Sequence, residues 1–210
     1  MKRLEVARTV VAVVALAVSW AAGCGERNAP SGAASTNTAP AELPAGLAAG
    51  VSLFGFDSTF TDQDGRAVRL ASYAGRPIVI AMVYTRCTSA CPLLLASMRR
   101  IESRMSARQR ADTWFVLVTL DPAHDRPDTL RAFAASRQLD PARWRLLTGG
   151  GGAVADLAAV LGVKVRDDGN GVLAHSSNLY LLDRTGVPRS ALVGLGAEPA
   201  ELLAARAAMR

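Results

Sequence analysis

Two long apolar runs rich in β-branched residues divide the middle of the chain. Residues 77–84 and 113–120 are typical of central strands covered on both faces, because they contain almost no polar positions. Between them, apolar residues recur at helical spacing over residues 92–107, with Pro92 suited to a first turn. A second helix is predicted over about residues 127–138. This part of the chain therefore predicts the order strand, loop, helix, strand, loop, helix.

The pattern changes on either side of this central part. Aromatic residues alternate with polar ones before a turn at residues 63–65, which predicts a two-stranded lead-in. After a glycine-rich break we expect a helix at residues 153–161, then an antiparallel hairpin from residues 178–183 and 188–193, and a closing helix at residues 198–209. The whole predicts an α/β sandwich of the thioredoxin type with an N-terminal β-hairpin extension, over residues 51–210.

The N-terminal part has a different character. Residues 1–8 are basic, and residues 9–22 are apolar and end in small residues, so residues 1–23 are predicted to be an export signal. Ala21-Ala-Gly-Cys24 resembles the bacterial lipobox, in which the cysteine is lipidated and becomes the mature N-terminus, although Ala21 replaces the usual leucine. We expect an exported, membrane-anchored lipoprotein that faces the periplasm or the cell exterior. Simple cleavage and an uncleaved anchor are the alternatives.

Residues 24–50 contain almost no large apolar side chains and are predicted to be a flexible tether. The 210 residues then suffice for one well-buried domain and a tail. The formal net charge of +6 is carried by scattered arginines and not by a basic stripe, so nucleic acid is not an expected partner.

Cys87 and Cys91 are the cysteines outside the N-terminal segment, and they stand where a buried strand passes into a helix. The positive end of a helix stabilises a thiolate, and positions i and i+4 of a helix project to one side. His175 precedes a strongly apolar strand. Two thiolates and a neutral imidazole form a soft ligand set that suits Cu(I), whereas structural zinc would want a fourth ligand.

Other interpretations of these residues stay open. In an oxidising compartment the two thiols tend to form a disulfide, so they must be kept reduced or metallated to bind a metal. A Cys87–Cys91 disulfide could also be purely structural, and His175 an ordinary loop histidine. Asp121 and Asp125 could orient a site residue, meet a partner or simply make a turn, and His124 is a reserve ligand candidate.

Three blocks make the chain resemble the Sco/SenC proteins, the copper chaperones that help to assemble cytochrome c oxidase. They are Tyr84-Thr-Arg-Cys-Thr-Ser-Ala-Cys-Pro92, Thr119-Leu-Asp-Pro-Ala-His-Asp125 and His175-Ser-Ser-Asn-Leu-Tyr-Leu-Leu-Asp183. Two positions depart from the family pattern. Thr88-Ser89 replaces a Pro-Asp pair, and Ala174 replaces an aspartate that could accept a hydrogen bond from the histidine ring.

The resemblance implies a copper-transfer protein and not an enzyme in the strict sense. Its metal ligands would be Cys87, Cys91 and His175, which would bind Cu(I) and, with an added ligand, Cu(II). Its expected partners are the copper-bearing subunit of cytochrome c oxidase, other copper chaperones or thioredoxin-like reductases, and the membrane through lipid on Cys24. A thiol-disulfide oxidoreductase that reduces the cysteines of a copper site, or a thiol-based redox sensor, is the alternative. A thiol peroxidase fits less well, because Thr85-Arg-Cys87 lacks the Thr-x-x-Cys spacing usual in peroxiredoxins and the second thiol would have no clear role.

Overall fold

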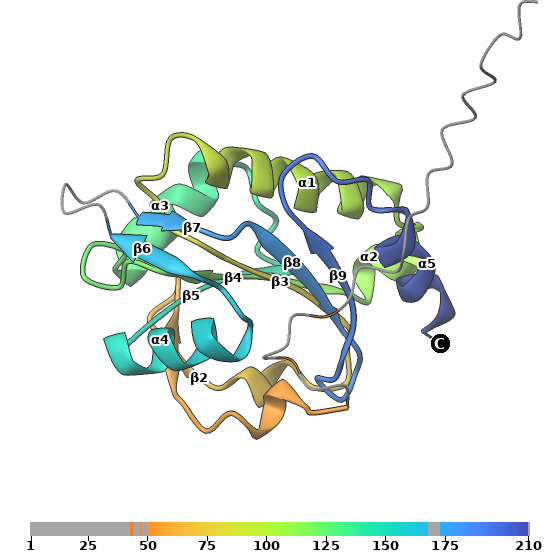
Figure 1. The fold of residues 1–210 in the computed structure, drawn as a ribbon, viewed down its shortest axis with the longest axis horizontal. Coiled ribbons are helices and arrows are strands. Elements are labelled where there is room, and N and C mark those ends of the chain that lie inside the picture. The colour runs from red at the N-terminus through yellow and green to blue at the C-terminus, as the bar shows by residue number, and fades with distance from the viewer. Residues whose placement is uncertain (1–42, 44–46, 48–49, 168–172, 210) are drawn as a thin grey trace, which may run out of the picture. The chain divides into compact units, whose positions relative to one another are not determined.

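A mixed β-sheet of seven strands forms the centre of the fold, with helices on both of its faces (Figure 1). The computed structural model describes residues 43, 47, 50–167 and 173–209, so the predicted signal segment and Cys24 lie outside the described residues. The strands follow the order β2-β1-β5-β4-β3-β8-β9. Their bounds are β1 Phe60–Asp62, β2 Ala67–Val68, β3 Ile78–Val83, β4 Trp114–Thr119, β5 Trp144–Gly149, β8 Asn178–Leu182 and β9 Pro188–Val193. A separate antiparallel pair consists of β6 Val165–Asp167 and β7 Leu173–His175.

The central strand β3 explains how the two layers are held together. It runs parallel to β4 and antiparallel to β8, and all of its residues are buried. Alternate side chains of a strand point to opposite faces. Val79 and Ala81 accordingly pack in the layer of α1 (Ala90–Arg104), α3 (Pro127–Ser136) and α5 (Ala200–Ala208). Ile80 and Met82 pack in the layer of α4 (Gly151–Val160) and the 3₁₀ helices η1 (Leu53–Gly55) and η2 (Leu70–Tyr73).

The predicted fold class is confirmed. The structure is an α/β sandwich of the thioredoxin type, and its N-terminal extension is the antiparallel hairpin of β1 and β2. The buried strands β3 and β4, the terminal hairpin of β8 and β9, and helices α1, α3, α4 and α5 all lie where the sequence predicts them. Among the described residues, none of the helices combines the length and the apolar character that crossing a membrane requires.

Several elements differ from the prediction. The segment with Phe54 forms the 3₁₀ helix η1, so the lead-in strand is confined to Phe60–Asp62. Helix α1 starts at Ala90 and ends at Arg104, and a short helix α2 (Ala107–Ala111) follows it. Strands β5, β6 and β7 were not predicted. Leu47, which falls in the predicted tether, is buried against the α4 layer.

Candidate metal centre

Cys87 and Cys91 lie where β3 passes into α1. Cys87 is in the connecting loop and Cys91 in the first turn of the helix, so Pro92 also falls within the first turn, where its missing N–H leaves no helical bond unmade. The backbone N–H of Cys91 donates to the Cys87 sulfur over 3.2 Å. This sulfur therefore takes the place that a side-chain oxygen usually has at a helix start. Both thiols are buried and neither is in a disulfide.

The two thiols differ in acidity. Burial raises the pKa of Cys87, but hydrogen bonds from Cys91, from the Ser89 backbone and from the Tyr84 side chain lower it to about 7. Burial, and then the neighbouring sulfur of Cys87, raise the pKa of Cys91 to about 12. Near neutral pH, Cys87 is therefore partly a thiolate. Cys91 loses its proton only when a metal ion displaces it or a strong base removes it.

His175 ends β7 and reaches the cysteines from a distant part of the sequence. Its Nε2 lies 3.4 Å from the Cys91 sulfur. Its Nδ1 lies 3.1 Å from the carbonyl oxygen of Ser176 and donates a proton there, because a carbonyl can only accept. The lone pair of the neutral ring is then on Nε2, which faces the sulfur. Burial lowers the pKa of His175, despite the Ser176 contact that raises it, so the ring is neutral at pH 7.

The Cys87 and Cys91 sulfurs and one His175 ring nitrogen lie within 4.8 Å of one another. A metal ion could be held by three or more cysteine, histidine or acidic side chains that lie close together, and among the described residues these three form such a group. Two sulfurs and a neutral imidazole are the donors that soft Cu(I) prefers, and the set contains no hard oxygen ligand. The structure thus brings together the three side chains that the sequence singled out. Their assignment as metal ligands stays a prediction.

Asp125 connects the cysteine loop to the sheet. Its side chain has no exposed surface. One carboxylate oxygen accepts the backbone N–H of Thr85 over 2.9 Å and the hydroxyl of Thr119 over 2.5 Å, and the other accepts the Thr85 hydroxyl. Thr85 lies two residues before Cys87, and Thr119 ends β4. Asp125 therefore fixes the start of the cysteine loop and does not point into the cluster of sulfurs.

Asp121 and His124 form a second group beside this loop. Asp121 accepts from Arg86 over 2.7 Å and pairs with Nδ1 of His124 over 2.8 Å. Burial raises the pKa of Asp121, but its hydrogen bonds with His124 and Arg86 lower it below its ordinary value. His124 is exposed and is not part of the Cys87–Cys91–His175 cluster. His124, the reserve ligand candidate, therefore lies at the surface in contact with Asp121 and Arg86.

Sequence reasoning missed three residues that shape the site. Tyr84 packs its ring edge-to-face against His175, with 6.0 Å between the ring centroids, and its side chain also bonds to Cys87. Ser176 sets the histidine tautomer through its backbone carbonyl, which leaves no trace in a sequence pattern. Thr119 lies at the end of a predicted strand beside Asp121, and this position at the edge of the sheet was a usable signal.

The fold and the site together define a class: a thioredoxin-like domain whose two thiols lie at the junction of a strand and a helix and face a histidine. The SCO1/SenC family model matches residues 49–209. The chain therefore belongs to the SCO1/SenC family.

Individual relatives agree with this assignment. The chain is 29% identical to the SCO1 protein homolog of Bacillus subtilis over 131 residues, which are 61% of this chain and 67% of the relative. It is similar to the structure of Bradyrhizobium japonicum ScoI with copper bound, with 26% identity, a TM-score of 0.57 and coverage of 71% of this chain and 95% of that one. It is also similar to BsSco, a member of the Sco family of cytochrome c oxidase assembly proteins in which a disulfide switch was identified. There the identity is 25% and the TM-score 0.61, with coverage of 72% and 92%.

Proposed function

We propose that this protein binds copper through Cys87, Cys91 and His175 and delivers it to the copper site of cytochrome c oxidase during assembly. The observation that carries the proposal is the convergence of the two sulfurs and the imidazole within 4.8 Å. The copper-bound structure of ScoI supports the choice of metal, and the family of BsSco supports the choice of target.

The chemistry of the site suits reversible binding. Cys87 is already partly ionised near pH 7 and Nε2 of His175 is unprotonated, so Cys91 is the ligand that must lose a proton in nearly every molecule. Two thiolates and a neutral ring give Cu(I) a complex with a single negative charge. Cu(II), which favours more ligands and harder donors, would take an additional ligand.

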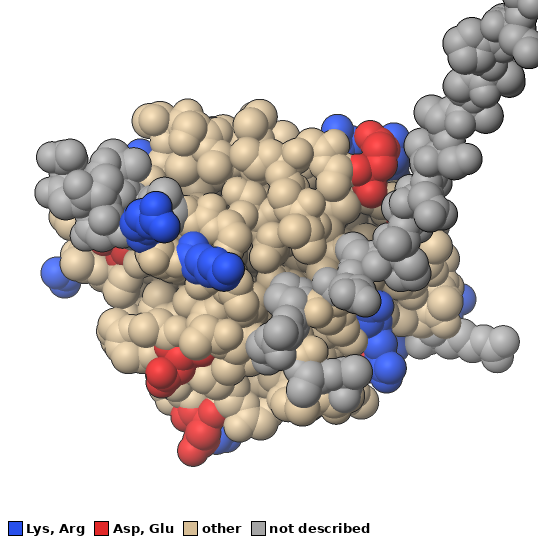
Figure 2. Space-filling view, in the orientation of Figure 1, with Lys and Arg blue, Asp and Glu red and all other residues tan. Residues whose placement is uncertain are grey.

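The surface around the site supports transfer to another protein. Large apolar side chains are exposed close to the ligands: Leu93 follows Cys91 on α1, and Val165 pairs with His175 across β6 and β7. Leu93 also lines a groove with Leu195. Figure 2 shows few charged side chains over most of α1. Exposed apolar patches are typical of surfaces that meet other proteins.

We also propose that the domain is exported and held at a membrane by lipid on Cys24, facing the periplasm or the cell exterior. The apolar segment before Cys24 and the small residues around it support this proposal. Replacing Cys24 with alanine should abolish incorporation of radiolabelled fatty acid and release the protein from membranes. Labelling that persists in the Cys24→Ala variant would refute lipidation at this residue.

Anaerobic titration of the reduced protein with Cu(I), in competition with a chelator, tests the metal site. We expect one Cu(I) per chain, and we expect His175→Ala to weaken binding by about 100-fold, since even a residue behind a ligand contributes about 10–100-fold. His124→Ala is the matched control and should leave the affinity unchanged. Equal effects of both substitutions, or none, would contradict the ligand assignment.

Delivery is tested separately with the copper-free, reduced copper-binding domain of a cytochrome c oxidase subunit. The Cu(I)-loaded protein should transfer its metal under anaerobic conditions, measured as the copper content of the acceptor after the two proteins are separated. Cu(I) binding without transfer would leave a copper-binding protein with another target.

The second candidate function is a thiol-disulfide oxidoreductase that reduces the cysteines of the target. The unequal thiols favour it, because Cys87 with its lowered pKa is suited to attack on a disulfide and Cys91 with its raised pKa to resolution of the mixed disulfide. Disulfide exchange does not need the imidazole. The His175→Ala variant should therefore keep reductase activity while its Cu(I) affinity falls about 100-fold, which separates the two functions.

A further inference from the structure

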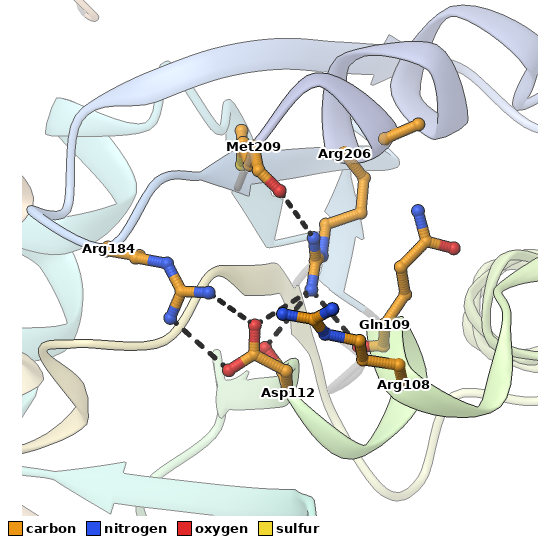
Figure 3. A pocket seen from close by; sticks show the side chains of 7 residues that line it. Arg108, Gln109, Asp112, Arg184, Arg206 and Met209 are labelled. Carbon is orange, nitrogen blue, oxygen red and sulfur yellow. Dashed lines mark hydrogen bonds and ion pairs between the residues drawn. The ribbon is translucent and has the colours of Figure 1, made fainter.

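Three arginines converge on a cavity at the end of the fold where α2 and α5 lie, away from β7 and His175 (Figure 1). The cavity has a volume of about 390 Å³. Arg108 comes from α2, Arg184 from the turn between β8 and β9, and Arg206 from α5. Figure 3 shows their guanidinium groups gathered around the carboxylate of Asp112.

The described lining of this cavity carries more positive than negative side chains. Asp112 is the acidic residue of the lining, and it is shared: Arg184 contacts it over 2.6 Å and Arg206 over 3.3 Å. The other partners of Arg206 are neutral oxygens of Thr113, Gln109, Asp112 and Met209. Among the described residues that line the cavity, three guanidinium groups face one carboxylate, a formal excess of two positive charges.

Repulsion between these cations affects the pKa of Arg206. Burial lowers the pKa of Arg206, Asp112 raises it, and Arg184 lowers it again. Arg76 stacks on Trp114 and is not among the lining residues; burial lowers its pKa, Asp112 raises it, and Arg145 and Arg184 lower it further. An anion that entered the cavity would relieve this repulsion.

A structural role explains only part of the cluster. The buried Arg206 connects α5 to the carbonyl groups at the end of α2, and Arg184 connects the β8–β9 turn to Asp112. Arg108 takes part in neither connection. It is exposed and makes no ion pair with a described residue, yet its side chain is turned toward the other two guanidinium groups (Figure 3).

We propose that this cavity binds a phosphate group, from a free phosphate or phosphate ester or from a lipid headgroup. Guanidinium groups match phosphate oxygens through paired N–H donors, and clusters of arginines are a common way to recognise this group. Ala207 and Met209 add an apolar side to the cavity, which would contact the organic part of an ester. The inference is independent of copper binding, because it uses none of the metal-site residues.

Calorimetric titration of the full chain, in a neutral and phosphate-free detergent, tests the proposal with two soluble probes. One probe is inorganic phosphate, and the other is glycerophosphoglycerol, the headgroup of a common anionic lipid without its acyl chains. We expect saturable binding, and we expect Arg108→Gln to weaken it about fivefold, which corresponds to ~1 kcal/mol. Arg131→Gln, which removes the same charge from the exposed surface of α3, should have no effect.

The outcomes separate the sources and can overturn the proposal. Tighter binding of inorganic phosphate indicates a free phosphate or ester, and tighter binding of the diester indicates a lipid headgroup. The proposal fails if neither probe saturates the protein, if chloride at matched ionic strength gives the same signal, or if Arg108→Gln and Arg131→Gln weaken binding equally. Circular dichroism of both variants shows that they are folded.

Discussion

Replacing Asp125 with asparagine should loosen the cysteine loop without touching a predicted metal ligand. The substitution keeps the shape of the side chain and removes its charge. In the wild type, the carboxylate accepts three hydrogen bonds, two from Thr85 and one from Thr119. An asparagine side chain has one acceptor oxygen and turns an NH₂ group toward at least one of these donors.

The size of the effect follows from the burial of the site. A hydrogen bond to a charged group contributes about 1.5–3 kcal/mol, and a buried donor left without an acceptor costs about 1–3 kcal/mol. We therefore expect Asp125→Asn to lower the free energy of unfolding by roughly 2–3 kcal/mol. Thr85 lies two residues before Cys87, so part of this free energy holds the thiols in place. If about 1.4 kcal/mol of it is needed to restore their positions when the metal binds, the Cu(I) affinity falls tenfold.

Two measurements on the same preparations check this prediction. Urea unfolding gives the loss of stability, and anaerobic Cu(I) competition gives the affinity of the folded protein. Asp128→Asn is the control, since Asp128 is exposed in the first turn of α3 and its charge contributes about 0.3–1 kcal/mol there. A Thr85→Val substitution combined with Asp125→Asn should cost less than the sum of the two single changes, because both remove the same contacts.

The reasoning fails in either of two cases. If Asp125→Asn is no more destabilising than Asp128→Asn, the buried contacts have no net value. If it destabilises the fold but leaves the Cu(I) affinity of the folded protein unchanged, Asp125 supports the sheet and does not position the thiols.

Three further changes test other parts of the structure. In the metal-free, reduced protein, the rate of Cys87 alkylation by iodoacetamide should rise with pH around a midpoint near 7, because the pKa of this thiol is lowered and the thiolate is the reactive form. Peptide mapping by mass spectrometry measures the rate, and a midpoint near that of a free thiol contradicts the contact between the Cys91 N–H and the Cys87 sulfur. Gly186→Ala should lower the free energy of unfolding by at least about 2 kcal/mol, since φ is +81° and the new Cβ would lie 2.6 Å from the Phe54 ring. Gly196→Ala, at φ +80° with no atom close to the new Cβ, should lower it by only about 1 kcal/mol. Thermal or urea unfolding measures both, and equal losses of stability would show that the Phe54 ring moves aside freely. Tyr180→Phe should lower the unfolding free energy by about 1–2 kcal/mol, because the buried hydroxyl bonds to both Leu161 and Asn178, and an unchanged stability would show that these contacts have no net value.

Apolar periodicity was enough to predict most of the sheet. β3 and β4 are recognisable because strands buried on both faces are apolar at every position, and the β8–β9 hairpin because Thr185 and Gly186 mark its turn. β5 escaped because it contains Arg145 and ends in glycines, so its sequence lacks a continuous apolar run. Its strand character comes from pairing with β1 and β4, which is a tertiary effect.

The candidate site could be predicted as a set of residues but not as a geometry. Two cysteines with helical spacing and a late histidine are visible in the sequence, and the resemblance supplied the reason to connect them. The β6–β7 pair that carries His175 was missed, since each strand has only three residues. The different acidity of the two thiols also could not be predicted, because it depends on which sulfur accepts the Cys91 N–H and which is more deeply buried.

The absence of an aspartate before His175 is compensated within the histidine's own segment. An aspartate at position 174 was the expected acceptor for the ring N–H, and Ala174 offers none from its side chain. The Ser176 carbonyl accepts this proton instead, so Nε2 still faces the Cys91 sulfur in the unprotonated form. A neutral carbonyl stabilises a protonated ring less than a carboxylate would, and burial already lowers the pKa of His175. The replacement therefore keeps Nε2 unprotonated and makes the imidazole a weaker base, so the proposed copper ligand should release its metal more readily than one backed by a carboxylate.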